Sequence, residues 1–193
     1  MGRRPPRAVV LGLMLLAPGV LAQDATRGEQ MAQACAPCHG PNGNSTDPRY
    51  PILAGQTVKY AYLQLKDYNE GRRLDPDMTP VTANISKEDM LALAVHFAEQ
   101  TPISIRFKPD AERAARGKYR ADVTLCASCH QGQYQGQNES PRVAGQHPQY
   151  LTKQMLDFKS RARTNDAATM TSLSATLSDE DIEDIVQYLA GLY

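Results

Sequence analysis

The sequence has few aromatic side chains, with no tryptophan, three phenylalanines and nine tyrosines among 193 residues. It also lacks an excess of either charge, because 21 basic and 21 acidic residues give a formal net charge of zero. Proteins that bind nucleic acid usually carry a basic surplus, so we expect no nucleic-acid partner. The 22% of charged residues, 13 glycines and 13 prolines are ordinary values. They argue against a disordered or collagen-like chain.

Long apolar stretches are also scarce, and the one that stands out lies at the N-terminus. Three arginines among the first seven residues precede the apolar run Ala8–Leu16, and Val20, Leu21 and Ala22 follow a Pro-Gly pair. This layout is typical of a secretory signal peptide over residues 1–22, cleaved after about Ala22. The run is shorter than the roughly 20 residues of a membrane-spanning helix. We therefore expect an exported protein whose chain after cleavage carries a net charge of about −3, because three arginines are removed with residues 1–22. A peripheral association with the membrane surface stays open.

Four cysteines are present, and their spacing is specific. In an exported protein an even number of cysteines usually indicates disulfides. Here, however, each pair is followed directly by a histidine, giving two Cys-x-x-Cys-His motifs. The first motif consists of Cys35, Cys38 and His39, and the second of Cys126, Cys129 and His130.

The chain is an internal repeat. The segment 51–56, Pro-x-x-Ala-Gly-Gln, recurs 90 positions later at 141–146, and the cysteine motifs recur at an offset of 91. Helical periodicity is expected over 58–68 and 148–158, and Ser-x-x-Asp capping boxes start a further helix in each copy at Ser86 and Ser178. Strand signals are nearly absent. The pattern predicts an all-α tandem of two small domains, residues 23–102 and 111–193, joined by a linker at 103–110.

Four kinds of site compete for the cysteine motifs. Zinc sites usually combine two Cys-x-x-Cys units within a short span, whereas these lie 87 residues apart in separate repeat copies. A thioredoxin-type redox pair belongs in a βαβ context, and local disulfides leave the histidines without a role. Covalent haem c accounts for both thiols and for the histidine, which is held against the iron. We therefore expect two haem c groups, attached through Cys35, Cys38, Cys126 and Cys129, with His39 and His130 as iron ligands.

A low-spin electron carrier needs a second iron ligand. The other histidines, His96 and His147, do not recur in the second copy, so we interpret them as a helix-face and a loop residue. Of the methionines, only Met78 and Met170 repeat, 39 and 40 residues after the motif histidines and in polar loops where a core role is unexpected. The sequence therefore predicts His/Met ligation at both irons.

With these motifs the whole chain after residue 22 resembles the dihaem cytochrome c4 family. The resemblance implies two class I cytochrome c folds related by a pseudo-twofold axis, each wrapped around one covalently bound haem. It also implies that the carbonyls of Pro51 and Pro141 accept the proximal imidazole protons, and that Arg73 and Arg163 can pair with haem propionates.

The resemblance further implies a periplasmic carrier of single electrons in a respiratory chain, between a quinol:cytochrome c oxidoreductase and a terminal oxidase or reductase. Such a carrier has redox proteins as partners, no small-molecule substrate and no enzyme activity. Two alternatives stay open. One is the dihaem electron-transfer subunit of a flavocytochrome sulfide dehydrogenase or another haem oxidoreductase. The other is a haem enzyme, such as a peroxidase or a thiosulfate-oxidising cytochrome, with an open position at one iron.

Overall fold

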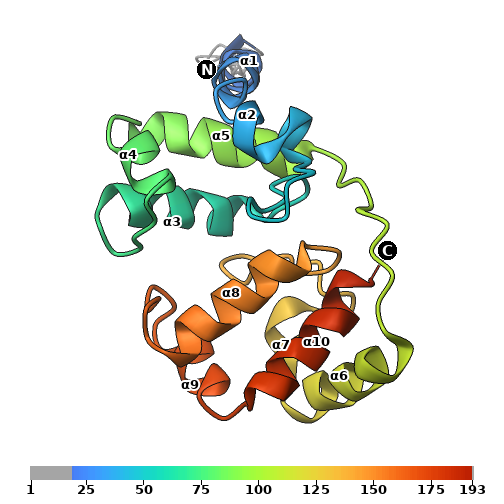
Figure 1. The fold of residues 1–193 in the computed structure, drawn as a ribbon. Coiled ribbons are helices and arrows are strands. Elements are labelled where there is room, and N and C mark those ends of the chain that lie inside the picture. The colour runs from blue at the N-terminus through green and yellow to red at the C-terminus, as the bar shows by residue number, and fades with distance from the viewer. Residues whose placement is uncertain (1–18, 193) are drawn as a thin grey trace, which may run out of the picture.

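The computed structural model describes residues 19–192, with side chains from residue 26 onward. The predicted signal peptide lies mostly outside the described residues. Figure 1 shows two helical lobes joined by an extended segment, the N-terminal lobe blue to green and the C-terminal lobe yellow to red. The elements are α1 (Gly19–Ala32), α2 (Ala36–His39), the 3-10 turn η1 (Pro41–Gly43), α3 (Val58–Asn69), α4 (Met78–Thr82), α5 (Lys87–Glu99), α6 (Ala111–Val123), α7 (Cys126–His130), α8 (Pro148–Lys159), α9 (Thr169–Ser174) and α10 (Asp179–Ala190).

The predicted all-α class is confirmed in the described part of the chain, where the only sheet-like pairing is an isolated bridge between Gln137 and Ser140. Both helices predicted to start at a serine do so. Ser86 accepts a hydrogen bond from the backbone of Asp89, and Ser178 forms a complete capping box with Asp181. The short helices α2, α4, α7 and α9 had no periodicity to predict them, because each is only four to six residues long.

The two lobes repeat one packing scheme. In the N-terminal lobe α5 packs against α1 and α3, and in the C-terminal lobe α10 packs against α6 and α8. The first and last helices of each lobe cross closely because a glycine lies at the contact. Gly28 of α1 faces the carbonyl of Ala92, and Gly117 of α6 faces the carbonyl of Asp184.

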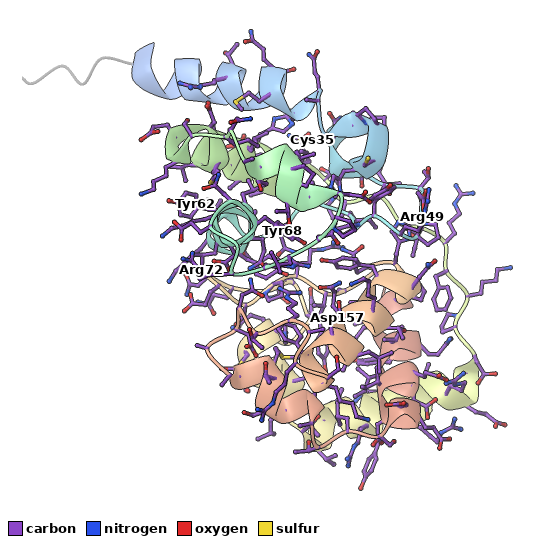
Figure 2. The ribbon with its side chains drawn as sticks, turned by 60° about the vertical axis from the view of Figure 1, so that its left-hand side comes forward. Cys35, Arg49, Tyr62, Tyr68, Arg72 and Asp157 are labelled. Atoms are coloured by element: carbon purple, nitrogen blue, oxygen red, sulfur yellow. The ribbon has the colours of Figure 1, made fainter. Side chains whose placement is uncertain are left out.

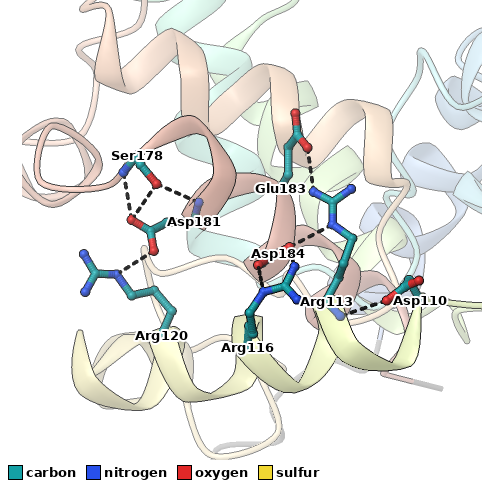
Figure 3. Close-up of polar contacts among 8 residues, drawn as sticks. All are labelled: Asp110, Arg113, Arg116, Arg120, Ser178, Asp181, Glu183 and Asp184. Carbon is teal, nitrogen blue, oxygen red and sulfur yellow. Dashed lines mark hydrogen bonds and ion pairs between the residues drawn. The ribbon is translucent and has the colours of Figure 1, made fainter.

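Polar contacts reinforce the helix crossing of the C-terminal lobe (Figure 3). The Asp184 carboxylate of α10 is buried and accepts hydrogen bonds from Arg113 and Arg116 of α6 at 2.8 and 2.7 Å. Burial opposes ionisation of Asp184, but these two guanidiniums outweigh it and lower the pKa of the carboxyl. The N-terminal lobe has alanine, Ala92, at the equivalent place. In that lobe the pairing between the crossing helices instead joins Arg27 of α1 to Asp89 of α5. The two copies therefore share a fold and an arginine–aspartate contact between these helices, but place the aspartate differently.

The lobes are hydrogen-bonded to each other through the repeated glutamines. The Gln56 amide accepts from the Arg142 N–H at 2.8 Å and donates to the Arg142 carbonyl at 3.1 Å. Gln146 does the same with the backbone of Ile52, at 2.8 and 3.0 Å. Each glutamine side chain thus forms two hydrogen bonds, one donated and one accepted, with the backbone of a single residue in the other lobe. Because Gln56 and Gln146 occupy equivalent places in the repeat, the two sets of bonds are related by pseudo-symmetry.

Within the described residues, no helix combines the length and the apolar character that crossing a bilayer requires.

Candidate haem sites

The first cysteine motif forms the short helix α2, with Cys35 as its N-cap and Pro37 in its first turn. This turn places His39 in the protein interior, where it is 5% exposed. Its ring Nδ1 lies 2.9 Å from the carbonyl oxygen of Pro51, which can only accept, so Nδ1 carries the proton. The other ring nitrogen, Nε2, is buried without a hydrogen-bond partner. A buried imidazole fixed in this tautomer presents an unprotonated Nε2, which is the form that ligates iron.

The second motif repeats this arrangement in α7. His130 is 9% exposed, and its Nδ1 donates to the carbonyl oxygen of Pro141 at 2.8 Å. Two additional residues separate the glycine of α6 from Cys126, compared with the first copy, and Leu125 takes up the extra length in a left-handed conformation at φ 57°. His130 therefore keeps the hydrogen bond to a proline carbonyl, although the segment between α6 and the second cysteine motif is longer than in the first copy.

The four cysteines are free thiols rather than disulfides. Cys35 and Cys126 are half-buried, and burial raises the pKa of both thiols. Cys38 and Cys129 are exposed at the surface. Figure 2 shows Cys35 beside α2, whereas Tyr68 and Arg72 lie on the side of the lobe that faces Asp157 of α8. Burial lowers the pKa of both motif histidines, His39 and His130, so both rings are neutral near pH 7.

The residues of both motifs therefore fit covalent haem. Each has two reduced thiols one helical turn apart, and each has a neutral imidazole whose protonation state a carbonyl fixes. A zinc site fits less well, because the described residues contain no group of three or more His, Cys, Asp or Glu side chains arranged to hold a metal ion.

Met78 and Met170 occupy corresponding places in the two lobes. Met78 begins α4, and its N–H donates to a carboxylate oxygen of Asp75 at 3.1 Å. Met170 lies in the first turn of α9, where the Asp166 carboxylate accepts from the neighbouring Thr171 N–H and hydroxyl. Both methionine side chains are half-buried. An aspartate thus anchors the backbone at or beside each methionine.

His96 lies on α5, as interpreted from the sequence, but His147 is more than a loop residue. It precedes α8 as its N-cap residue and is 5% exposed. Its Nε2 lies 2.9 Å from the carbonyl oxygen of Ser45 in the other lobe. The histidine therefore holds the lobes together. Internal repetition could not reveal this role, because Thr57 occupies the same place in the first copy.

Arg73 and Arg163 meet at the boundary between the lobes, and both are 7% exposed. Arg73 donates to Gln64 of its own lobe at 2.9 Å and to Gln154 of the other lobe at 2.7 Å. Arg163 donates to the same two amide oxygens, at 3.0 and 2.7 Å. Each guanidinium also bonds a tyrosine hydroxyl of the opposite lobe, Tyr150 for Arg73 and Tyr60 for Arg163. We call these six residues the interlobe arginine cluster.

The interlobe arginine cluster places two like charges side by side in a buried position. Within the described residues, the side-chain partners of Arg73 and Arg163 are amide and tyrosine oxygens rather than carboxylates. Arg73 also lies over the ring of Tyr68, and Arg163 over the ring of Phe158. Burial opposes ionisation of Tyr60, but Arg163 and Arg73 outweigh it and lower the pKa of its hydroxyl. Sequence repetition identified both arginines, but it did not predict that each would bond residues of the opposite lobe.

Comparison with known proteins agrees with this geometry. The profile of the cytochrome c family matches residues 25–97 and 114–192, one match for each lobe. Cytochrome c4 of Pseudomonas aeruginosa is 37% identical over 194 residues, covering 96% of each chain. The chain belongs to the cytochrome c4 family.

Other relatives of this cytochrome c4 are consistent with that assignment. The crystal structure of reduced recombinant cytochrome c4 from Pseudomonas stutzeri superposes with a TM-score of 0.81 at 32% identity, covering 88% of this chain and 98% of that one. A thiosulfate dehydrogenase electron acceptor of Stutzerimonas stutzeri is 31% identical and covers 83% of this chain and 80% of its own. The protein is thus a dihaem electron-transfer cytochrome with two cytochrome c domains, as the sequence predicted.

Proposed function

We propose that this cytochrome c4 carries single electrons in the periplasm between a quinol-oxidising complex and a terminal oxidase or reductase. Each haem, when bound, supplies an iron that alternates between the ferric and ferrous states. His39 and His130 would each hold the iron of one haem through the unprotonated Nε2, and Met78 and Met170 would supply the second protein ligand of each iron. An iron held by two protein ligands would have no position open for a small substrate, so the proposed function needs no enzymatic step in this chain.

The observation that carries this proposal is the exposure of one attachment cysteine in each domain. Cys38 and Cys129 lie at the surface while the histidine of the same helical turn is buried. A haem bonded to these cysteines would have one attachment point at the surface, while the histidine that binds its iron is buried. A partner protein can then approach that attachment point through a small, transient interface.

The two domains differ in charge, which favours different partners for each. Residues 23–104 carry seven basic and ten acidic side chains, whereas residues 105–193 carry 11 of each. We expect the acidic N-terminal domain to be steered towards a partner with a basic docking surface.

Stopped-flow mixing tests the proposal directly. The reduced quinol-oxidising complex is expected to reduce the purified protein, and a terminal oxidase to reoxidise it, with two haems per chain in a haem assay. The two reactions should respond differently to rising salt, because screening weakens charge steering. Failure of either reaction contradicts the proposed chain of transfer, and identical salt dependence contradicts the assignment of separate docking domains.

A second donor is favoured by the relative that serves as a thiosulfate dehydrogenase electron acceptor. In that case the chain receives its electrons from a thiosulfate-oxidising enzyme rather than from a quinol-oxidising complex. The same stopped-flow experiment, with a thiosulfate dehydrogenase and thiosulfate as reductant, distinguishes the two donors by their rates. A chain that oxidises thiosulfate or sulfide without a partner would instead be an enzyme.

The interlobe arginine cluster supports a further part of the proposal, namely that Arg73 and Arg163 pair with haem propionates. Two buried guanidiniums without a carboxylate partner need an anion nearby to offset the cost of burying them together. Propionates are carboxylates, which arginine binds well through paired N–H donors.

Replacing Arg73 by glutamine tests this pairing. Loss of a cation that favours ferrous iron is expected to lower the reduction potentials of both haems by on the order of 30–60 mV, about three- to tenfold in the equilibrium. Redox titration measures this change. Arg161→Gln, a substitution of an exposed arginine two residues before Arg163, is the control and should change neither potential. Unchanged potentials in Arg73→Gln would assign the cluster to domain packing alone.

A further inference from the structure

The loop that precedes Pro51 places a tyrosine beside the first cysteine motif. The ring of Tyr50 lies edge-to-face with the ring of His39, and the two centroids are 6.1 Å apart. The Asp77 carboxylate and the Cys38 thiol are close enough to the Tyr50 hydroxyl to raise its pKa. Tyr50 therefore lies next to both the predicted iron ligand and the exposed attachment cysteine of the first domain.

An arginine is held in place over this tyrosine. The guanidinium carbon of Arg49 lies 5.3 Å from the centroid of the Tyr50 ring. Its Nε and Nη2 donate to the Asp47 carboxylate at 3.1 and 2.6 Å. Even so, 66% of the Arg49 side chain is exposed, and Figure 2 shows Arg49 at the edge of the N-terminal lobe, away from Arg72. A guanidinium fixed in this way loses little conformational freedom when another protein contacts it.

The residue types and the surrounding charges are those of a protein-binding surface. Arginine and tyrosine contribute more than most residues to binding at protein–protein interfaces. An exposed ion pair such as Asp47–Arg49, in contrast, contributes little to the stability of a fold. Asp77 adds an exposed carboxylate, and the domain as a whole carries more acidic than basic side chains. These charges fit a partner with a basic docking surface.

The second domain uses the equivalent loop differently. At an offset of 90, the residues in place of Asp47, Arg49 and Tyr50 are Gln137, Glu139 and Ser140. Glu139 pairs with Lys59 of the first domain at 2.8 Å, and Gln137 and Ser140 bond each other through their backbones. The second loop therefore contributes to the contact between the domains, and only the first carries an arginine and a tyrosine.

We propose that Arg49 and Tyr50 form the anchor on which a redox protein with a basic docking surface binds to the first domain, beside Cys38. This inference rests on the proposed electron-carrier function. The second domain lacks both side chains at the equivalent place, so a partner of that domain must bind through other contacts. The repeat thus acquires two docking surfaces of different specificity from one fold.

Arg49→Gln tests the inference in the intact dihaem protein. The probes are the quinol-oxidising complex and a terminal oxidase, with binding measured by surface plasmon resonance and electron transfer by stopped flow. For one of the two partners we expect a dissociation constant about tenfold higher and a second-order rate about tenfold lower, as for truncation of an interface anchor. The other partner should not respond. Lys87→Gln removes the same charge from an exposed place on the same domain; this matched control should have little effect on either partner.

Two further measurements separate docking from an effect on the iron. Both reduction potentials should be unchanged in Arg49→Gln, because the side chain is exposed. Reduction by ascorbate, which needs no docking surface, should be as fast as in the parent protein. If the potential of one haem shifted and ascorbate reduction slowed to the same extent as the partner reaction, Arg49 would act on the haem and the anchor would be wrong.

Substitutions of Tyr50 test the second half of the anchor. Tyr50→Ser introduces the residue of the second copy and should weaken binding of the same partner as Arg49→Gln does. Tyr50→Phe keeps the ring beneath the guanidinium and should retain most of the affinity. Equal affinities of the parent, Tyr50→Ser and Tyr50→Phe proteins would remove Tyr50 from the anchor.

The parent protein assigns each failure to its cause. If the parent reacts with neither partner, the proposed electron-carrier function fails. If the parent reacts with both partners and Arg49→Gln changes neither dissociation constant, only the anchor is overturned. Equal weakening with both partners would also overturn it, because a general effect of the lost charge would then explain the result.

Discussion

Replacing Met170 by leucine is expected to abolish the sulfur-to-iron charge-transfer band of one haem and to lower its reduction potential by on the order of 100 mV or more. The identity of the axial ligand tunes haem potentials over about 0.8 V, and a thioether favours ferrous iron. Leucine has a similar volume and no sulfur, so the change isolates ligation from packing. Met78→Leu should have the same effect on the other haem. Absorption spectra of the ferric protein and redox titration measure both changes.

Two other methionines provide matched controls. Met90 of α5 and Met155 of α8 are buried core residues, 1% and 8% exposed, and leucine at either place should preserve both bands and both potentials. If Met90→Leu or Met155→Leu removed a band, that residue would replace the proposed ligand. The double variant Met78→Leu and Met170→Leu should lose both bands while keeping both covalent haems, because attachment depends on the cysteines.

The fold was largely predictable because it is written twice. A single Cys-x-x-Cys-His motif or a single Ser-x-x-Asp helix start is weak evidence, but recurrence at a constant offset of about 90 fixed the domain type and the helix order. The scarcity of aromatic residues is consistent with the small buried cluster in the N-terminal domain, where Ala32, Leu93 and Phe97 form the core. A bound haem adds the apolar surface that such a cluster needs.

The domain boundary could not be predicted in the same way, because repetition indicates what the copies share and not how they meet. Gln56 and Gln146 recur in the sequence, yet only the three-dimensional structure places each against the backbone of the other domain. His147 has Thr57 at its place in the first copy, a different residue type, so the repeat gave no signal that His147 bonds Ser45 or that Thr57 bonds the carbonyl of Asn138 in the other lobe. Contacts between the two domains depend on how whole domains pack together. The spacing of residues within one copy does not predict that packing.

The crossing of α6 and α10 leaves no room for a side chain at Gly117. A Cβ atom there would lie 1.9 Å from the carbonyl oxygen of Asp184 and 2.3 Å from its carbonyl carbon. These are backbone atoms of a packed helix, so relief requires the two helices to move apart. In an exposed helix, alanine in place of glycine is stabilising by up to about 1 kcal/mol. Because the helices approach so closely here, we expect Gly117→Ala to lower the free energy of unfolding rather than raise it.

Gly117→Ala is expected to destabilise the C-terminal domain by about 3 kcal/mol, at the upper end of overpacking effects, and to lower its unfolding temperature by roughly 10 °C or more. Separation of α6 from α10 would also lengthen the bonds of Arg113 and Arg116 to Asp184, which adds to the loss. Thermal unfolding followed by circular dichroism measures the change. Gly132→Ala is the matched control, because a Cβ there has no atom within 4 Å; it should leave the unfolding temperature nearly unchanged. If both variants unfolded at the parental temperature, the glycine would not limit the approach of the helices, and the close crossing would have to depend on the arginine–aspartate contacts instead.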